Sequence, residues 1–435
     1  MSREPDLFAA LRSVASLLFG VFILILGNAL LGILLPVRMG VEQMSSEVAG
    51  LVMSCYYVGL VGGSLWGKRI IAGVGHIRAF AAFAAGASAA TLLHALWFDP
   101  IPWALLRVLS GFCMAALFAA IESWLNMRSS NETRGQVLSL YVVVAYLGSS
   151  GGQFLVNFGD VQSLQPFMLT ALLLTVSLVP VVLTRVAGPE IEASARLSLR
   201  RLYEISPVGV VGCAVSGIIT GAFYGMGAIY AQNLGYSVFE VSLFMGVTVI
   251  GGLIAQWPIG RLSDAFDRRT VMLCVLLAMA AVCGGSFAMA SYGSQSFLGV
   301  LVLTCLFGGA AASVYPLAIA HACDYVEQKQ MLAASSGLLL SWALGSAVGP
   351  LLAAGVMGRF GDPALYLVLT GAALFLAGFV RYRMTRRVAR PADEQTNFVP
   401  VSTIASPPTE LDPRAEAQAG EIIAPDDPRG PLQPA

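Results

Sequence analysis

The chain has 435 residues, of which 57% are hydrophobic and 11% are charged, and its 25 basic and 25 acidic residues give a net charge of zero. A soluble domain carries about 25% charged residues, so this composition excludes a soluble globular protein. The zero balance also excludes a basic nucleic-acid-binding surface. The seven cysteines include no C-x-x-C pair, which predicts buried hydrophobic side chains rather than disulfides or a zinc site. We therefore expect a polytopic helical membrane protein without a metal or cofactor.

The charge-poor runs of the chain are long enough to cross a bilayer, which takes about 20 mainly apolar residues. The run 270–323 is too long for one helix, and a turn-like SYGSQ cluster at 291–295 divides it in two. The sequence thus predicts an all-α fold with twelve transmembrane helices. In chain order the runs are 13–37, 48–67, 79–98, 101–121, 135–159, 161–184, 205–239, 241–260, 270–323, 330–358 and 363–380.

The basic residues test this count independently, because cytoplasmic loops of membrane proteins hold most of the Lys and Arg. With twelve spans, all 25 basic residues except Arg38, Arg107 and Arg359 fall on the side of the two termini. The pattern predicts a multi-pass membrane protein with both termini in the cytoplasm.

The polar stretch 186–206 divides the chain into an N-terminal six-helix half, residues 1–185, and a C-terminal six-helix half, residues 207–385. Residues 386–435 are polar and rich in proline. We expect 186–206 to be a cytoplasmic connecting loop and 386–435 to be a disordered cytoplasmic tail.

The two halves carry traces of an internal repeat. Residues 146–152 (YLGSSGG) align with 343–349 (ALGSAVG), and 68–77 aligns with 260–269, each pair at the same place in its half. A duplicated six-helix unit places a transport pathway between the halves.

These stretches resemble a known family. Residues 260–269 (GRLSDAFDRR) resemble the signature loop of the major facilitator superfamily, and Arg107-x-x-x-Gly111 resembles a second motif of that family. Residues 121–125 (IESWL), 134–135 and 315–318 (YPLA) further resemble its YcaD-like branch of bacterial permeases. The resemblance implies a secondary transporter of the bacterial inner membrane. Ala72 stands at the acidic position of the N-terminal loop and Asp267 at a usual glycine, which puts an acidic gate contact in one half only.

Arg107 is the charge most deeply placed in the membrane, about 9 Å into the fourth span at 1.5 Å per residue. A central arginine costs roughly 2.5–3.5 kcal/mol on insertion scales, so it is expected to face a cavity, unless it snorkels to the interface. Asn28 and Tyr224 fall at a similar depth and complete a candidate substrate patch. Asn28 is equally suited to bonding a neighbouring helix.

Tyr315 is a further candidate for the pathway, although aromatic residues near helix ends also serve as interface anchors. The same two readings apply to a set of aromatic and amide side chains in the apolar runs, namely Tyr56, Tyr57, Tyr146, Gln153, Gln256 and Trp342.

Glu122 lies about 22 Å further along the fourth span than Arg107, near the cytoplasmic boundary. We expect it to act in a gate with Arg134 or the 68–78 loop; coupling to protons and an ordinary interfacial acid are the alternatives. His321 and Asp324 share this depth, either as a pH-sensitive pair or as a helix-end contact.

The loop 260–269 is the other candidate gate. Asp264 is placed to meet the positive N-terminus of a helix. Arg261, Arg268 and Arg269 belong to the same gate, or else simply mark the cytoplasmic side.

The leading hypothesis is a secondary transporter that moves a small solute by alternating access, coupled to protons and directed toward export of amphipathic compounds. Uptake of a sugar or organic acid is the alternative, and a passive conduit or membrane sensor is the second class. An enzyme is not expected, because the apolar spans hold no catalytic cluster. Residues 62–68 imitate a phosphate loop but lack its Ser or Thr, so the expected partners are solute, protons and lipid, not ATP or nucleic acid.

Overall fold

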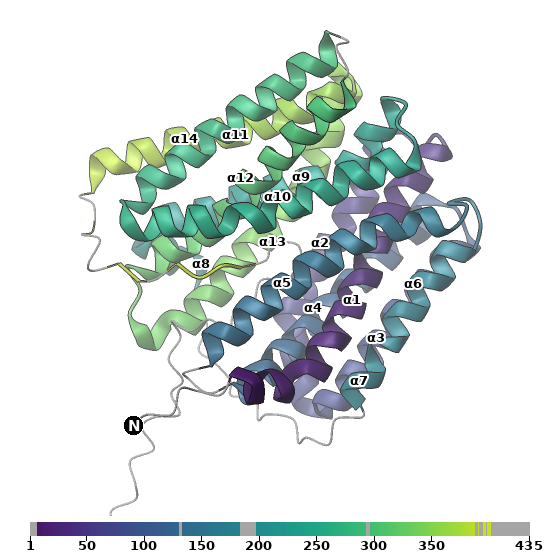
Figure 1. The fold of residues 1–435 in the computed structure, drawn as a ribbon, viewed down its shortest axis with the longest axis horizontal. Helices are drawn as coiled ribbons and strands as arrows, with labels where there is room; N and C mark the ends of the chain where they lie inside the picture. The colour runs from purple at the N-terminus through teal and green to yellow at the C-terminus, as the bar shows by residue number, and fades with distance from the viewer. Residues whose placement is uncertain are drawn as a thin grey trace, which may run out of the picture.

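The computed structural model describes residues 7–129, 133–182, 197–292, 296–387, 390, 395–396 and 398–401. Within these ranges every regular element is helical, and twelve helical segments are long and apolar enough to cross a membrane. The predicted all-α fold with twelve spans is confirmed. Figure 1 shows the N-terminal helices in purple and blue beside the C-terminal helices in green.

The N-terminal half contains six spans, the last of which is broken. Asp99 caps the fourth helix by accepting a hydrogen bond from the Ile101 amide, and Pro100 follows at the first helical position. The sixth span is interrupted at Ser177, so that it consists of two helices. The elements are α1 (Leu7–Val41), α2 (Ser46–Val74), α3 (His76–Leu96), α4 (Pro100–Arg128), α5 (Arg134–Phe154), the 3-10 turn η1 (Leu155–Phe158), α6 (Gln165–Val176) and α7 (Leu178–Val182).

The C-terminal half begins after a short helix within the connecting stretch. The elements are α8 (Leu199–Ile205), α9 (Pro207–Asn233), α10 (Val238–Ala265), α11 (Arg268–Ser291), α12 (Phe297–Cys323), η2 (Gln328–Gln330), α13 (Met331–Phe360), η3 (Asp362–Ala364) and α14 (Leu365–Arg386). Residues 186–196 of the expected connecting loop lie outside the described residues.

The two halves repeat one packing plan. In the first half α1 packs on α5, α2 on α4 and α3 on α6; in the second, α9 packs on α13, α10 on α12 and α11 on α14. Each pair joins spans of the same order in its half, so the predicted arrangement of two six-helix halves is present in the contacts themselves.

Glycines allow these pairs to approach closely. A Cβ atom on Gly63 of α2 would overlap the Phe112 carbonyl of α4, and one on Gly217 of α9 would overlap the Trp342 carbonyl of α13. Lipid provides no hydrophobic drive for association between spans, so close backbone contact of this kind supplies much of the packing.

The two ends of the bundle differ. We call the end where α1 begins and α14 ends the terminal end, and the other the opposite end. At the opposite end the halves meet directly through α2 with α13, α5 with α10 and α1 with α9. A Cβ atom on Gly50 would lie 2.8 Å from the Pro350 carbonyl oxygen of the other half, and Asn157 Nδ2 donates to Ser242 Oγ across the halves at 2.9 Å.

Candidate functional site

Arg107 lies inside the N-terminal half at mid-bundle. Its residue is 4% exposed, and its guanidinium carbon lies 4.3 Å from the centroid of the Tyr56 ring. The Tyr56 hydroxyl in turn hydrogen-bonds with the side chain of Asn28. Three helices, α1, α2 and α4, thus bring together two residues that the sequence proposed for the substrate patch, and the arginine faces protein instead of snorkelling to the interface.

In the part of the chain that the structure describes, no carboxylate pairs with this arginine. Its titratable neighbours there are Tyr56, Tyr57, Cys55 and His94, and its Nε has no hydrogen-bond partner. The cation–π contact with Tyr56 stabilises the charge in part, by about 2 kcal/mol when desolvated. The site therefore contains a buried positive charge without a fixed counter-ion.

Aromatic rings from the other half face this arginine's neighbours. The rings of Tyr57 and Trp342 are 6.5 Å apart, edge to face, and Trp342 is also 6.0 Å from Tyr315. Trp342 Nε1 donates to Thr220 Oγ1 at 3.3 Å. Tyr224 of α9 lies near Tyr57. We name the central site by these residues: Asn28, Tyr56, Tyr57, Arg107, Thr220, Tyr224, Tyr315 and Trp342.

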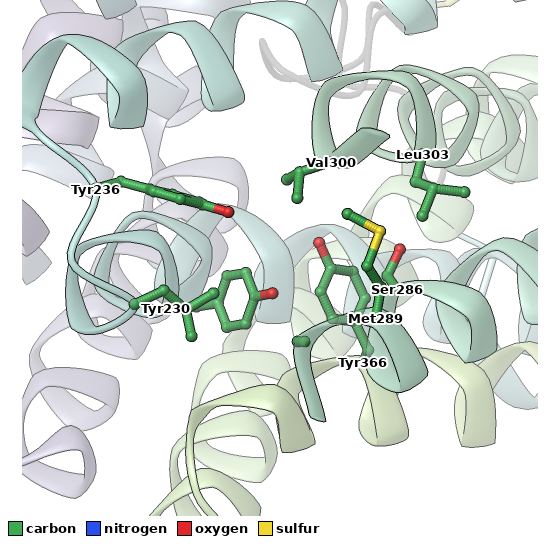
Figure 2. A pocket seen from close by; sticks show the side chains of 9 residues that line it. Tyr230, Tyr236, Ser286, Met289, Val300, Leu303 and Tyr366 are labelled. Carbon is green, nitrogen blue, oxygen red and sulfur yellow. The ribbon is translucent and has the colours of Figure 1, made fainter. Parts of the chain in front are cut away.

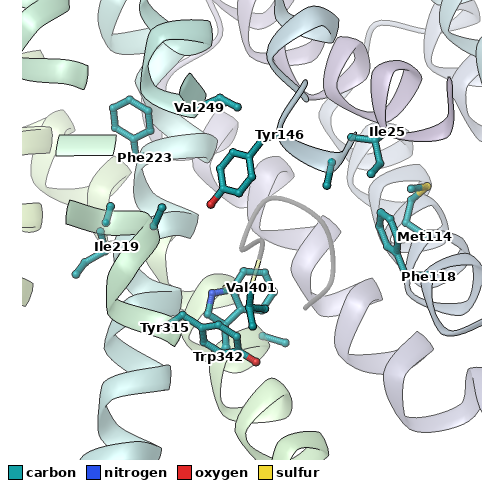
Figure 3. Packing of buried hydrophobic residues seen from close by; sticks show 14 of the residues in the cluster. Ile25, Met114, Phe118, Tyr146, Ile219, Phe223, Val249, Tyr315, Trp342 and Val401 are labelled. Atoms are coloured by element: carbon teal, nitrogen blue, oxygen red, sulfur yellow. The ribbon is translucent and has the colours of Figure 1, made fainter. Parts of the chain in front are cut away.

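A cavity adjoins the central site on the side of the C-terminal half. It has a volume of about 10 Å³, close to what one water molecule needs, and is lined by side chains that include Tyr146, Thr220, Tyr224, Thr248 and Phe307. Tyr146 belongs to α5 of the N-terminal half, so residues of both halves border this space. Figure 3 shows Tyr146, Tyr315 and Trp342 within the same buried cluster.

A second cavity of about 10 Å³ lies wholly in the C-terminal half, between α9, α11, α12 and α14. Tyr230, Tyr236 and Tyr366 point toward one another around it, with Met289 and Val300 completing the wall (Figure 2). Because all of its lining residues come from one half, this cavity is not part of a pathway between the halves.

At the terminal end, three of the predicted gate residues form one charged group. Arg268 Nε lies 3.0 Å from Asp324 Oδ2, and these side chains are 1% and 3% exposed. Arg268 Nη2 is also 3.7 Å from Asp264 Oδ1. The group joins the junction of α10 and α11 to the end of α12. Asp264 was expected to meet a helix N-terminus; instead Asp267 caps α11, and Asp264 faces Arg268.

The remaining residues of this loop have other contacts. Arg269 Nη1 donates to the Arg387 carbonyl at the end of α14 at 2.7 Å, so it ties two helix ends together. Arg261 stacks on the Trp257 ring at 3.8 Å and is exposed. The His321 ring lies 5.1 Å from that of Tyr325, and Asp324 pairs with Arg268.

The N-terminal half has no equivalent acidic loop, as Ala72 indicates, but it buries Glu122. This residue is 3% exposed and lies close to Tyr141 of α5. Arg134 is buried at the start of the same helix. A gate made by Glu122 and Arg134 stays a prediction.

Comparison with known proteins identifies the family. The sequence profile of the Major Facilitator Superfamily matches residues 17–230 and 208–413, once for each half. The chain is 32% identical over 366 residues to proteins described as uncharacterized MFS-type transporter YcaD from Shigella flexneri serotype 5b (strain 8401) and from Escherichia coli (strain SE11), covering 82% of this chain and 92% of each relative. The chain belongs to the major facilitator superfamily.

Solved structures of similar fold include the nucleoside transporter NupG, with a TM-score of 0.72 and 15% identity over 86% of this chain and 100% of that chain. A bacterial homolog to the human lysosomal transporter Spinster, inward-facing and occupied, has a TM-score of 0.65 and 14% identity over 88% and 97%. At these identities the likeness shows the fold. Membership of the major facilitator superfamily makes this chain a multi-pass membrane protein and a secondary transporter, not an enzyme.

The contacts of the C-terminal tail were not predicted from the sequence. In the tail expected to be disordered, Val399 and Val401 are 6% and 3% exposed, and Gln395, Thr396 and Phe398 contact the charged group at the terminal end. The short apolar run Phe398-Val-Pro-Val401 in an otherwise polar segment was the signal available. Residues 402–435 of the tail lie outside the described residues.

Proposed function

We propose that this transporter exports a small amphipathic organic anion across the bacterial inner membrane, and that Arg107 binds its anionic group. The observation that supports this proposal is the buried guanidinium of Arg107, which has no carboxylate partner among the described residues. An unpaired charge in a dry interior is costly, so a bound anion that pairs with it gains more than it would at an exposed arginine. The tyrosine and tryptophan rings around it suit an apolar or aromatic body.

Direct packing of the halves at the opposite end supports alternating access over a passive conduit. A conduit needs a path that stays open at both ends, whereas a transporter of this fold exposes its central site to one side at a time. We infer from the positive-inside pattern that the terminal end faces the cytoplasm. The described conformation is then the one closed toward the outside.

The membrane potential influences the direction in which an anion is transported. An inside-negative potential favours outward movement of a monovalent anion by about 2.3 kcal/mol per 100 mV, so export is downhill electrically. We propose that protons enter in exchange, with the buried carboxylate of Glu122 as their carrier or gate. Uptake of an organic acid would instead require protons to move with it.

Flux into and out of proteoliposomes tests this function. The substrates are aromatic carboxylates and sulfonates, each paired with its neutral amide, under imposed pH gradients and potentials. We expect the acids to move and the amides not to, and Arg107→Gln to reduce acid flux at least tenfold. Arg359→Gln, which removes an exposed arginine at the opposite end, is the matched control and should keep the flux.

Two results would overturn the proposal. Equal flux of an acid and its amide would remove the anion from the substrate class, and unchanged acid flux in Arg107→Gln would remove this arginine from the site. Acid flux that is insensitive to an imposed pH gradient would count against the proton exchange alone.

A further inference from the structure

Residues 395–396 and 398–401 contact α10, α11 and the end of α12 at the terminal end, and we call this contact surface the groove. Figure 1 shows this stretch in yellow, near the end of the bundle where α14 finishes. The chain leaves α14 at Arg386 and returns to contact residues of three other helices. The tail therefore reaches a surface that its own helix does not form.

The groove binds the tail backbone with the two carboxylates of the charged group. Asp324 Oδ1 accepts hydrogen bonds from the Thr396 amide and hydroxyl, both at 2.9 Å. Asp264 Oδ1 accepts one from the Phe398 amide at 2.7 Å. Amides two residues apart in an extended chain point to the same side, about 6.6 Å from each other. The two acids thus match the repeat of an extended peptide.

Side chains add to this backbone recognition. Arg268 Nε donates to Gln395 Oε1 at 3.1 Å. The Phe398 ring lies over Gly260, where a Cβ atom would be 2.5 Å from the ring. Gly260 is the first residue of the signature loop, so the absence of a side chain there provides the seat for the ring.

The far end of the stretch reaches the neighbourhood of the central site. Gln256 Nε2 donates both to the Val401 carbonyl and to the Tyr146 hydroxyl, each at 2.8 Å. Tyr146 lines the central cavity, and Val401 belongs to the buried cluster that includes Tyr315 and Trp342 (Figure 3). The tail therefore occupies the space between the terminal end and the cavity.

We propose that the groove of α10, α11 and α12 is a binding site for residues 395–401 of the chain itself, and that the bound tail is a plug that inhibits transport. Binding of the tail is independent of what the protein carries, whereas inhibition rests on the transport function proposed above. For the terminal end to close or to admit solute, the peptide has to leave Asp264, Asp324 and Gln256.

The binding site is tested with a fluorescein-labelled synthetic peptide of residues 390–403 and fluorescence anisotropy. The protein is the chain truncated after Arg387, which retains α14 and its contact with Arg269. We expect saturable binding to this truncated protein and at least tenfold weaker binding to the full chain, whose attached tail competes at a high effective concentration. A scrambled peptide of the same composition should not bind.

Two acid-to-amide variants of the truncated protein locate the contact. Asp264→Asn replaces a charged acceptor by a neutral one, so the peptide should bind roughly tenfold more weakly. Glu327→Gln makes the same change at an exposed position of the same end and should bind within twofold of the truncated protein. Equal affinity of the truncated and full chains, or equal effects of the two variants, would overturn the binding site.

Solute flux in proteoliposomes tests whether the bound tail inhibits transport. The chain truncated after Arg387 should transport the acids identified above several-fold faster than the chain truncated after residue 403, which keeps the plug. If the shorter protein does not fold, full-length Val401→Asp, which puts a charge at a buried position, should show the same gain. Equal flux together with confirmed peptide binding would overturn the inhibitory role, while absence of any flux would count against the proposed function and leave the binding result standing.

Discussion

The two ends of this bundle are filled by different kinds of contact. At the opposite end, Gly50 meets Pro350 backbone to backbone, so two whole halves must move before a path opens. At the terminal end, a peptide fills the space and is held by Asp264 and Asp324. The first arrangement depends on shape and the second on charge and hydrogen bonds. One end is therefore opened by rocking of the halves, and the other by release of a single segment.

The largest expected effect comes from breaking the charged group at the terminal end. Asp324→Asn removes the carboxylate charge from the pair in which Arg268 and Asp324 are 1% and 3% exposed, and breaking a buried pair costs about 3–5 kcal/mol. Thermal unfolding of the purified protein followed by tryptophan fluorescence should show a clear loss of stability. The double variant Arg268→Met, Asp324→Leu should recover much of it, since no charge is then left buried. An unaltered melting temperature in Asp324→Asn would show that this end is not held by charge.

A bulky residue at the opposite end should change the balance of conformations. Gly50→Leu overlaps Pro350 and Ala354, and overpacking of about 1–3 kcal/mol shifts a two-state population by roughly 5- to 150-fold. Distances between spin labels at Glu47 and Leu352 should lengthen.

The control for this change is Gly355→Leu on the same helix as Pro350, where the added side chain meets open space. Its label distances should match those of the parent. Lengthening in both variants, or in neither, would contradict the view that Gly50 marks the closing contact.

Salt concentration should affect the two ends differently, and this effect is smaller than those of the substitutions above. Raising the ionic strength from 0.1 to 1 M shortens the screening length from about 10 to 3 Å, and Asp264 is 42% exposed. Affinity for the 390–403 peptide should fall a few-fold, while the label distance at the opposite end stays constant. A salt-dependent label distance would mean that the opposite end is also held by charge.

The architecture could be predicted because the membrane allows few solutions. Uncharged runs of sufficient length have to form helices that satisfy their own backbone, and the paired arrangement of the halves follows from the repeat. Burial of Arg107 could be predicted for the same reason, because lipid excludes a charge. The position of a residue along a spanning helix gives its depth in the membrane. A similar depth was sufficient to place Arg107 and Asn28 in one candidate substrate patch.

The contact partners of individual side chains could not be predicted from position along the helices. Asp264 lies next to Arg268 and the Phe398 amide because of how α10, α11 and the tail cross in space, which sequence spacing does not encode. The tail itself was assigned from average composition, and composition does not register a run of four residues, 398–401, that finds a groove. The break at Ser177, in contrast, has a signal in the sequence, because Pro180 lacks the amide that would bond the Val176 carbonyl in a continuous helix.

The side-chain amide of Gln256 allows the tail to bind reversibly. Its Nε2 carries two hydrogens but has three acceptors within reach, the Tyr146 hydroxyl and the Val401 carbonyl at 2.8 Å and the Ala312 carbonyl at 3.4 Å. When the tail departs, two acceptors remain for two hydrogens, so no donor is stranded in the dry interior. Both hydrogens of Gln256 Nε2 therefore keep an acceptor with or without the peptide, which suits a binding site for a removable ligand.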